Sequence, residues 1–211
     1  MCNSAQADPA ELGRQTARLW TGAVAAPKPA PFRVDPSKLE ELTGMYRKLR
    51  DNTVIELKVK DGKLTIDQPV ELMPTGSGRL SAGERQFVID DARFREVTPN
   101  GDTVYERVEP AHPSDSDLVS LAGECASPET ATTLTIAAGA GELSLVVASN
   151  PPLGLRPTFR DAFMLRDRGA TSIRFLRDSS GNVTGLSAGD DRVWDLRFTR
   201  VNAGPSPAAA R

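Results

Sequence analysis

From about residue 39 onward, apolar and polar side chains alternate in short runs, a pattern that predicts β-strands rather than helices. In Ile55–Val59 the aliphatic residues fall on one face of a strand and the charged residues on the other. The next dipeptide, Asp61-Gly62, is typical of a type I′ turn, which needs two positive φ angles. Leu64 and Ile66 then resume the apolar row. This stretch predicts a β-hairpin.

The hairpin belongs to a pattern that occurs twice. Leu39–Ile66 aligns without a gap with Leu118–Leu145, at an offset of 79, the difference between positions 118 and 39. Six positions are identical: Leu39, Leu42, Gly44, Thr53, Gly62 and Leu64 meet Leu118, Leu121, Gly123, Thr132, Gly141 and Leu143. Internal repetition of this kind indicates a duplicated unit, so we expect two similar β-domains.

The second copy contains eight strand candidates with turn residues between most of them. They cover residues 119–126, 131–138, 142–148, 152–156, 160–166, 171–177, 182–188 and 192–201. Eight short antiparallel strands favour an up-and-down barrel, because closure removes the exposed sheet edges. A barrel of this size has room for its own side chains or for one small ligand.

The first copy is predicted to be smaller or more open. Its stretch Thr75–Gly83 is rich in glycine and serine and predicts a loop. Matching Val104-Tyr105-Glu106 with Val193-Trp194-Asp195 leaves it without a counterpart of the hairpin Val183–Asp191.

A helix is predicted before the barrels. Asp8 and Pro9 suit its first positions, and Leu12, Leu19 and Trp20 lie along one stripe. We therefore expect an all-β chain of two tandem antiparallel barrels, preceded by one helix and a proline-rich linker. The expected segments are 1–21 for the helix, 22–37 for the linker, 38–110 and 118–202 for the barrels, and 203–211 for a disordered tail.

Composition narrows the function classes. The net charge is −2 and aromatic residues make up 5%, which favours neither nucleic acid nor a membrane surface as a partner. We find no apolar run of about 18 residues that would span a membrane. No signal peptide is recognised at the start of this chain, so we expect a soluble protein, with its compartment left open.

Residues with catalytic potential are sparse. His112 is the single histidine and lies in a polar joint, while Cys2 and Cys125 are far apart in sequence. These residues suggest neither a zinc site nor a nucleophile–base pair. The pairs Asp115-x-Asp117 and Asp190-Asp191 occur where turns favour aspartate. We therefore predict no catalytic, cofactor-binding or metal-binding residue in this chain.

Several short motifs in the second copy resemble a known family. They are Leu121-x-Gly123 with Ser127-Pro128-Glu129, Asp161-Ala162-Phe163, Ile173-Arg174-Phe175-x-Arg177-Asp178, Gly181-x-Val183-Thr184-Gly185-Leu186 and Trp194-x-Leu196-x-Phe198-x-Arg200-Val201. Together they resemble the C-terminal lipocalin-like domain of serine hydrolases in the class C β-lactamase and penicillin-binding group. The first copy is similar but less complete.

The resemblance implies a D-aminopeptidase-like layout, in which a catalytic domain precedes two lipocalin-like barrels. Residues 1–21 would then be the last strand end and helix of that catalytic domain. The family's Ser-x-x-Lys and Tyr-x-Asn motifs do not occur here, and Lys60-Asp61-Gly62 is the hairpin turn described above rather than a catalytic Lys/His-x-Gly strand, so no catalytic residue is carried over. The implied partner is a β-lactamase-fold hydrolase domain, missing in cis or supplied in trans, from a parent either exported to the periplasm or cytoplasmic. Homo-oligomers are a further expectation.

Two functions follow as expectations. The first is a non-catalytic accessory region that shapes substrate access to, or assembly of, a parent hydrolase. The alternative is a stand-alone module that binds a small apolar ligand inside the second barrel. If loops contact a partner, the candidates are Arg156 and Arg160 within Asn150–Arg160, and Arg79 and Arg85 within Thr75–Arg85.

Overall fold

The computed structural model describes residues 13, 15–17, 19–20, 36–66, 70–76, 78–83, 85–90, 93–98, 101–166 and 170–201. Chain contacts divide the molecule into Met1–Pro31 and Phe32–Arg211. In the first unit the described residues are helical, with Leu19 and Trp20 exposed. The expected strand end at residues 1–3, most of the linker, Leu12 of the helix and the tail 203–211 lie outside the described residues.

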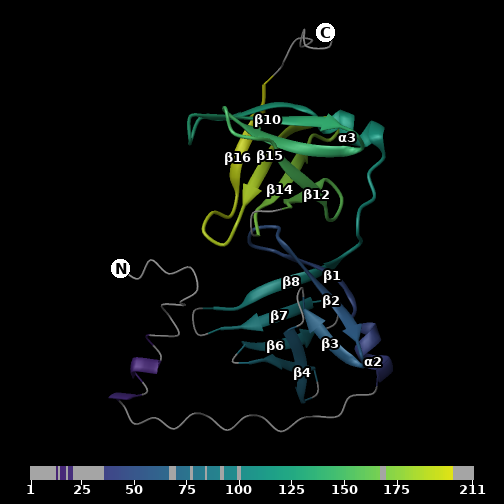
Figure 1. Cartoon of the computed structure of the whole chain (residues 1–211), viewed down its shortest axis with the longest axis vertical. Coiled ribbons are helices and arrows are strands. Elements are labelled where there is room, and N and C mark those ends of the chain that lie inside the picture. Colours follow the sequence, from purple (N-terminus) through teal and green to yellow (C-terminus); the bar gives the residue numbers. More distant parts are fainter. Residues whose placement is uncertain are drawn as a thin grey trace. The chain divides into compact units, whose positions relative to one another are not determined.

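The first barrel is a closed antiparallel sheet in which each strand pairs with its neighbours in sequence and β1 also pairs with β8. Figure 1 shows these strands in blue to teal. They are β1 (Gly44–Lys48), β2 (Val54–Lys60), β3 (Lys63–Ile66), β4 (Val70–Gly76), β5 (Arg79–Ala82), β6 (Arg85–Asp90), β7 (Arg93–Val97) and β8 (Thr103–Val108).

The second barrel has the same order, with β9 paired to both β10 and β16. Its strands are β9 (Gly123–Ser127), β10 (Thr132–Gly139), β11 (Glu142–Val147), β12 (Leu153–Pro157), β13 (Ala162–Leu165), β14 (Ser172–Arg177), β15 (Val183–Gly189) and β16 (Leu196–Arg200) (Figure 1). The prediction of an all-β chain with two tandem antiparallel barrels is therefore confirmed.

The expectation of a smaller or more open first barrel is wrong. The stretch read as a loop, Thr75–Gly83, contains the end of β4 and the whole of β5. Strand β5 pairs on both sides, with β4 and with β6, and Leu80 and Ala82 enter the core. The glycines and serines of Thr75–Gly83 weaken the local strand signal, but ring closure supplies hydrogen-bond partners on both edges of β5.

Apolar side chains from every strand fill both barrels. In the first barrel each strand contributes at least one: Tyr46, Leu57, Leu64, Leu72, Leu80, Phe87, Phe94 and Tyr105. The second core takes Cys125, Leu134, Ile136, Leu143, Leu145, Leu155, Phe163, Ile173, Phe175, Leu186 and Phe198. These residues are the inward positions of the alternating pattern, so the binary pattern of the sequence determines the contents of both barrels.

A short helix precedes each barrel and adds leucines to its core. Helix α2 (Pro36–Glu41) contributes Leu39, and α3 (Asp115–Leu121) contributes Leu118 and Leu121. Ser114 begins α3 with a capping box: its hydroxyl accepts from the Asp117 amide at 3.3 Å, and its own amide donates to the Asp117 carboxylate at 2.9 Å. The predicted joint and strand start at 110–126 thus include a helix that the sequence interpretation missed.

In each barrel, an arginine of the last strand is hydrogen-bonded to the segment that leads into the first strand. Arg107 donates to the carbonyl oxygens of Glu41 and Thr43, and Arg200 donates to those of Ser120 and Ala122. These arginines therefore occupy equivalent places in the two repeats, so β8 of the first barrel corresponds to β16 of the second. The earlier match of Val104 with Val193 is wrong, because Val193 precedes β16 rather than lying in it.

A glycine lies under each of these arginines. Gly44 and Gly123 have φ angles of 139° and 144°, and a Cβ atom at Gly123 would lie 3.0 Å from the Arg200 guanidinium. The close approach and the positive φ together account for glycine at both repeat positions.

Replacing Arg200 by alanine should lower the free energy of unfolding by about 1–2 kcal/mol, because two carbonyl oxygens lose a charged donor. Arg197→Ala on the same strand is the matched control, since the Arg197 side chain pairs, among the described residues, only with the exposed Asp195, and it should change stability by less than about 0.5 kcal/mol. Urea unfolding followed by circular dichroism measures both. Equal effects of the two substitutions would contradict a specific role for Arg200.

Candidate functional site: a groove on the second barrel

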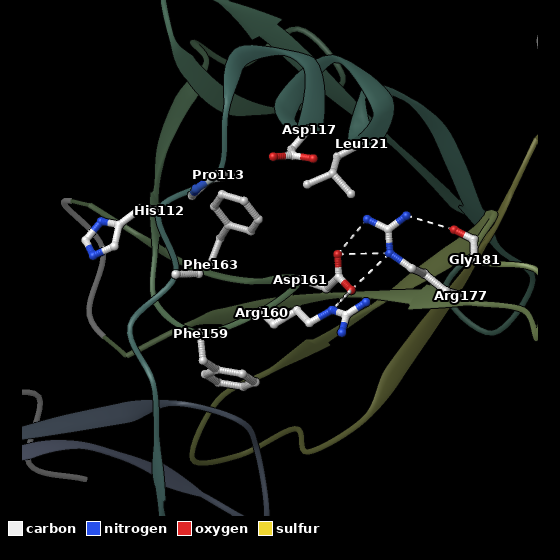
Figure 2. Close-up of a pocket in the computed structure, with 11 residues that line it drawn as sticks. His112, Pro113, Asp117, Leu121, Phe159, Arg160, Asp161, Phe163, Arg177 and Gly181 are labelled. Atoms are coloured by element: carbon white, nitrogen blue, oxygen red, sulfur yellow. Dashed lines mark hydrogen bonds and ion pairs between the residues drawn. The ribbon is translucent and has the colours of Figure 1, made fainter.

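A groove with a volume of about 430 Å³ lies on the second barrel, beside α3. Its lining comes from the joint before α3, from α3 itself, from the β12–β13 turn, from β13, and from β14 and the turn after it (Figure 2). The lining residues are Ala111, His112, Pro113, Asp117, Leu121, Phe159, Arg160, Asp161, Phe163, Arg177 and Gly181. Buried rings and a leucine form its floor, and charged groups stand above them.

The central polar contact of the groove is the ion pair between Arg177 and Asp161. The Arg177 Nη2 lies 2.6 Å from Oδ1 of Asp161, and its Nε lies 3.0 Å from both carboxylate oxygens. Arg177 also donates through Nη1 to the carbonyl of Gly181 at 2.8 Å (Figure 2). Such a multidentate pair fixes the orientation of both side chains. The hydrogen bonds to Asp161 further raise the pKa of Arg177, so the guanidinium keeps its charge.

The β12–β13 turn places Asp161 by its backbone. Asp161 has a φ of 58°, a left-handed conformation that aspartate tolerates better than most residues. Its carbonyl accepts from the Phe175 amide at 2.7 Å, which ties the turn to β14. At the tip of the turn Arg160 is 92% exposed, and its Nε lies 3.8 Å from the Asp161 carboxylate.

Asp117 brings a second carboxylate to the groove from the first turn of α3 (Figure 2). Hydrogen bonds from Ser114 lower its pKa, and the nearby charge of Arg177 lowers it further. The carboxylate therefore remains ionised at neutral pH and serves primarily as a helix cap.

The four arginines expected as contact residues have different locations. Arg160 lines the groove at an exposed turn. Arg156 is exposed on β12, and Arg79 lies on β5 rather than in a loop. Arg85 lies on β6, where its Nε is 2.7 Å from Glu96 and its guanidinium is 5.0 Å from the centre of the Phe87 ring. The structure thus brings only Arg160 of this set into the groove.

Two lining residues that matter here were not expected. Arg177 and Asp161 were noticed only as parts of family-like motifs, and their 16-residue separation in sequence hides the pair. His112, interpreted as a solvated joint residue, is exposed and lies on the rim of the groove (Figure 2).

Of the carboxylates interpreted as turn residues, Asp190 forms a turn, whereas Asp115 and Asp117 lie in the first turn of α3. Asp178 also forms a turn. Asp178 Oδ1 accepts from the amides of Ser180 and Asn182, at 2.9 and 2.8 Å. Asp190 Oδ1 accepts from the amides of Arg192 and Val193, at 2.8 and 2.7 Å. These hydrogen bonds lower the pKa of both carboxyls. Among the described residues no group of three or more His, Cys, Asp and Glu side chains could hold a metal ion.

Cys125 lies in the core of the second barrel and is 3% exposed. Burial raises the pKa of its thiol, so at a given pH less of the reactive thiolate is present than in a free cysteine. A Cys2→Ser variant treated with a disulfide reagent at about pH 8 should therefore react at least about tenfold more slowly folded than in denaturant. Equal rates in the two states would mean that Cys125 is accessible in the folded protein.

The fold and the groove define a tandem-barrel protein with a charged surface groove. A scan against protein-family models finds no match to this sequence, and a search of curated proteins finds none either. In the part of the chain that the structure describes, no helix is both long and apolar enough to cross a membrane.

Proposed function

We propose that this chain is the non-catalytic accessory region of a serine hydrolase related to class C β-lactamases and penicillin-binding enzymes. In this proposal the barrels limit substrate access to a catalytic domain, supplied in cis or in trans, or organise its assembly. The observation that carries it is that side chains of every strand occupy the barrel interiors. A barrel whose interior is filled by its own side chains supports a scaffold role better than a role in binding a ligand inside the barrel.

The chemistry of the groove supports the same proposal. Among the described residues that line the 430 Å³ hollow beside α3 there is no serine, threonine, cysteine or lysine, so this part of the groove offers no hydroxyl, thiol or amine as a nucleophile. In its central ion pair, the guanidinium of Arg177 already donates to both carboxylate oxygens of Asp161 and to the Gly181 carbonyl. Such a groove suits binding rather than covalent catalysis.

The nucleotide sequence upstream of the Met1 codon is the first test. We expect an in-frame continuation that encodes Ser-x-x-Lys and, further on, Tyr-x-Asn. An intergenic region without such a frame would contradict a catalytic domain in cis, and a hydrolase gene elsewhere would then have to supply it.

The role of the barrels can be tested on the protein that includes the proposed upstream catalytic domain. Deleting residues 36–201 should increase kcat/KM for bulky substrates relative to small ones if the barrels limit access, or change the oligomeric state if they organise assembly. The present chain alone should turn over neither esters nor β-lactams. A deletion that changes neither substrate range nor oligomeric state would contradict the accessory role.

The alternative, a module that binds a small apolar ligand, is tested by displacement of a fluorescent fatty acid from the present chain. Stacked rings at the centre of the first barrel weigh against it, with Phe87 and Phe94 4.9 Å apart. Saturable binding at micromolar concentration would favour the alternative over the scaffold.

A further inference from the structure

The groove continues past Phe159 into a second hollow of about 650 Å³. The two hollows share Phe159, Arg160, Asp161, Arg177 and Gly181, so they lie next to each other on the surface, and we treat them together as the groove. Two additional arginines, Arg47 and Arg174, line the second hollow. This end of the groove therefore carries four arginines, against the two aspartates Asp161 and Asp178.

The positive charge at this end is only partly neutralised. Asp161 is occupied by Arg177, and Arg47 pairs with Glu106 at 2.9 Å. Arg160 has only a longer contact with the already paired Asp161. The side chain of Arg174 makes no hydrogen bond or ion pair with another described residue, although its charge contributes to lowering the pKa of Asp195. Two guanidinium groups are thus available to an incoming anion.

Arg47 adds a donor that no described residue accepts. Its guanidinium lies over the Phe159 ring, 5.4 Å from the ring centre, and its Nε is buried without a hydrogen-bond partner among the described residues. A buried donor without an acceptor is costly, so this guanidinium is not fully satisfied by its ion pair with Glu106.

We propose that this groove binds an extended peptide segment with carboxylate side chains, presented by a partner protein. Guanidinium groups bind carboxylates through two parallel hydrogen bonds, which suits Arg160 and Arg174 to glutamate or aspartate. The first hollow has an apolar floor, with Leu121 and Phe163, and accommodates an apolar side chain next to the acidic ones.

A peptide fits this groove better than other anions. The rim residues His112, Arg160 and Gly181 are exposed, so the groove is open along the surface and suits an extended chain rather than an enclosed small molecule. The net charge of −2 provides no broad basic surface for the repeated phosphates of nucleic acid. The inference goes beyond the accessory role, because it names the chemistry of a partner segment and holds whether or not that partner is a hydrolase.

Fluorescence anisotropy with the full chain tests the proposal. The probe is a labelled, end-blocked peptide that alternates leucine with pairs of glutamate, and the comparison peptide has glutamine at every glutamate. We expect saturable binding of the glutamate peptide, at least about tenfold weaker binding of the glutamine peptide, and a loss of affinity as salt increases.

Charge-matched double variants assign the binding to the groove. Arg160→Ala with Arg174→Ala should weaken binding about tenfold. Arg79→Ala with Arg156→Ala removes the same charge from exposed arginines that are not among the lining residues, and should leave binding within about twofold. Circular dichroism melting verifies that both variants fold.

Three results would overturn the proposal. An equal loss of peptide affinity in the two double variants would mean that the peptide is attracted non-specifically by the net charge of the protein. Equal binding of the glutamate and glutamine peptides would mean that carboxylates are not recognised. Inorganic phosphate that displaces the glutamate peptide at equal concentration would identify a site for a small free anion instead of a peptide.

Discussion

Replacing Phe94 by alanine should lower the free energy of unfolding by about 3–5 kcal/mol, the largest effect expected for any single core position of the first barrel. Phe94 is 1% exposed and stacks on Phe87, with ring centres 4.9 Å apart. The rings of Tyr46 and Tyr105 lie tilted against it, each at 5.8 Å. Truncation removes three aromatic contacts at once and leaves a cavity that the rigid ring of strands cannot close.

Val97→Ala is the matched control for this prediction. Val97 lies on the same strand, β7, but is 40% exposed, so its truncation should cost less than about 1 kcal/mol. Urea unfolding followed by far-ultraviolet circular dichroism compares the two variants with the parent chain. If Phe94→Ala unfolded at the same urea concentration as Val97→Ala, the ring cluster would not be the centre of the barrel core.

The sequence predicted those parts of the fold that local chemistry determines. The hairpin at Asp61-Gly62 is confirmed: the two residues have φ angles of 52° and 73°, and Leu57 faces Ile66 across β2 and β3. In the second barrel every predicted strand is present, because clear turn residues separate the apolar runs. Turn type and the alternation of side chains are encoded within a few residues, so they can be read without the tertiary structure.

Elements stabilised by distant partners were missed. Strand β5 has four residues, and its weak local signal is overcome by pairing with β4 and β6. Helices α2 and α3, of six and seven residues, are too short to show a helical period. The capping box of α3 uses aspartate at the position where glutamate or glutamine is usual, and its signal in the sequence was overlooked.

The groove could not be predicted because no single segment forms it. Its residues come from the joint, α3, the β12–β13 turn, β13 and β14, which meet only after the barrel closes. The sequence put Arg160 at the end of the loop Asn150–Arg160 and at the start of the predicted strand 160–166, and the structure places it in the exposed turn before β13. The sequence could not identify Arg177 as the partner of Asp161. Two residues that are distant in sequence and brought together by strand pairing can be recognised as partners only once the strand register is known.

Asp51 links the two barrels. It lies in the β1–β2 turn and is fully buried, and its carboxylate accepts from the Thr53 amide at 3.0 Å and pairs with Lys48 at 2.6 Å. Its carbonyl oxygen accepts from the Ser172 hydroxyl on β14. A Cβ atom at Gly189 would lie 2.6 Å from that oxygen, so the turn fits against the second barrel only because residue 189 is glycine.

Replacing Asp51 by alanine should therefore cost about 3 kcal/mol, because Lys48, whose side chain is 18% exposed, loses its counter-ion and two donors of Thr53 lose their acceptor. Asp102→Ala is the control: Asp102 pairs with Arg95 at 2.7 Å at a more exposed site, and its loss should cost less than about 1 kcal/mol. Thermal and urea unfolding measure both variants. Since a buried charge without a partner is far more costly than an exposed one, equal destabilisation by the two substitutions would mean that water reaches Asp51 in the folded protein.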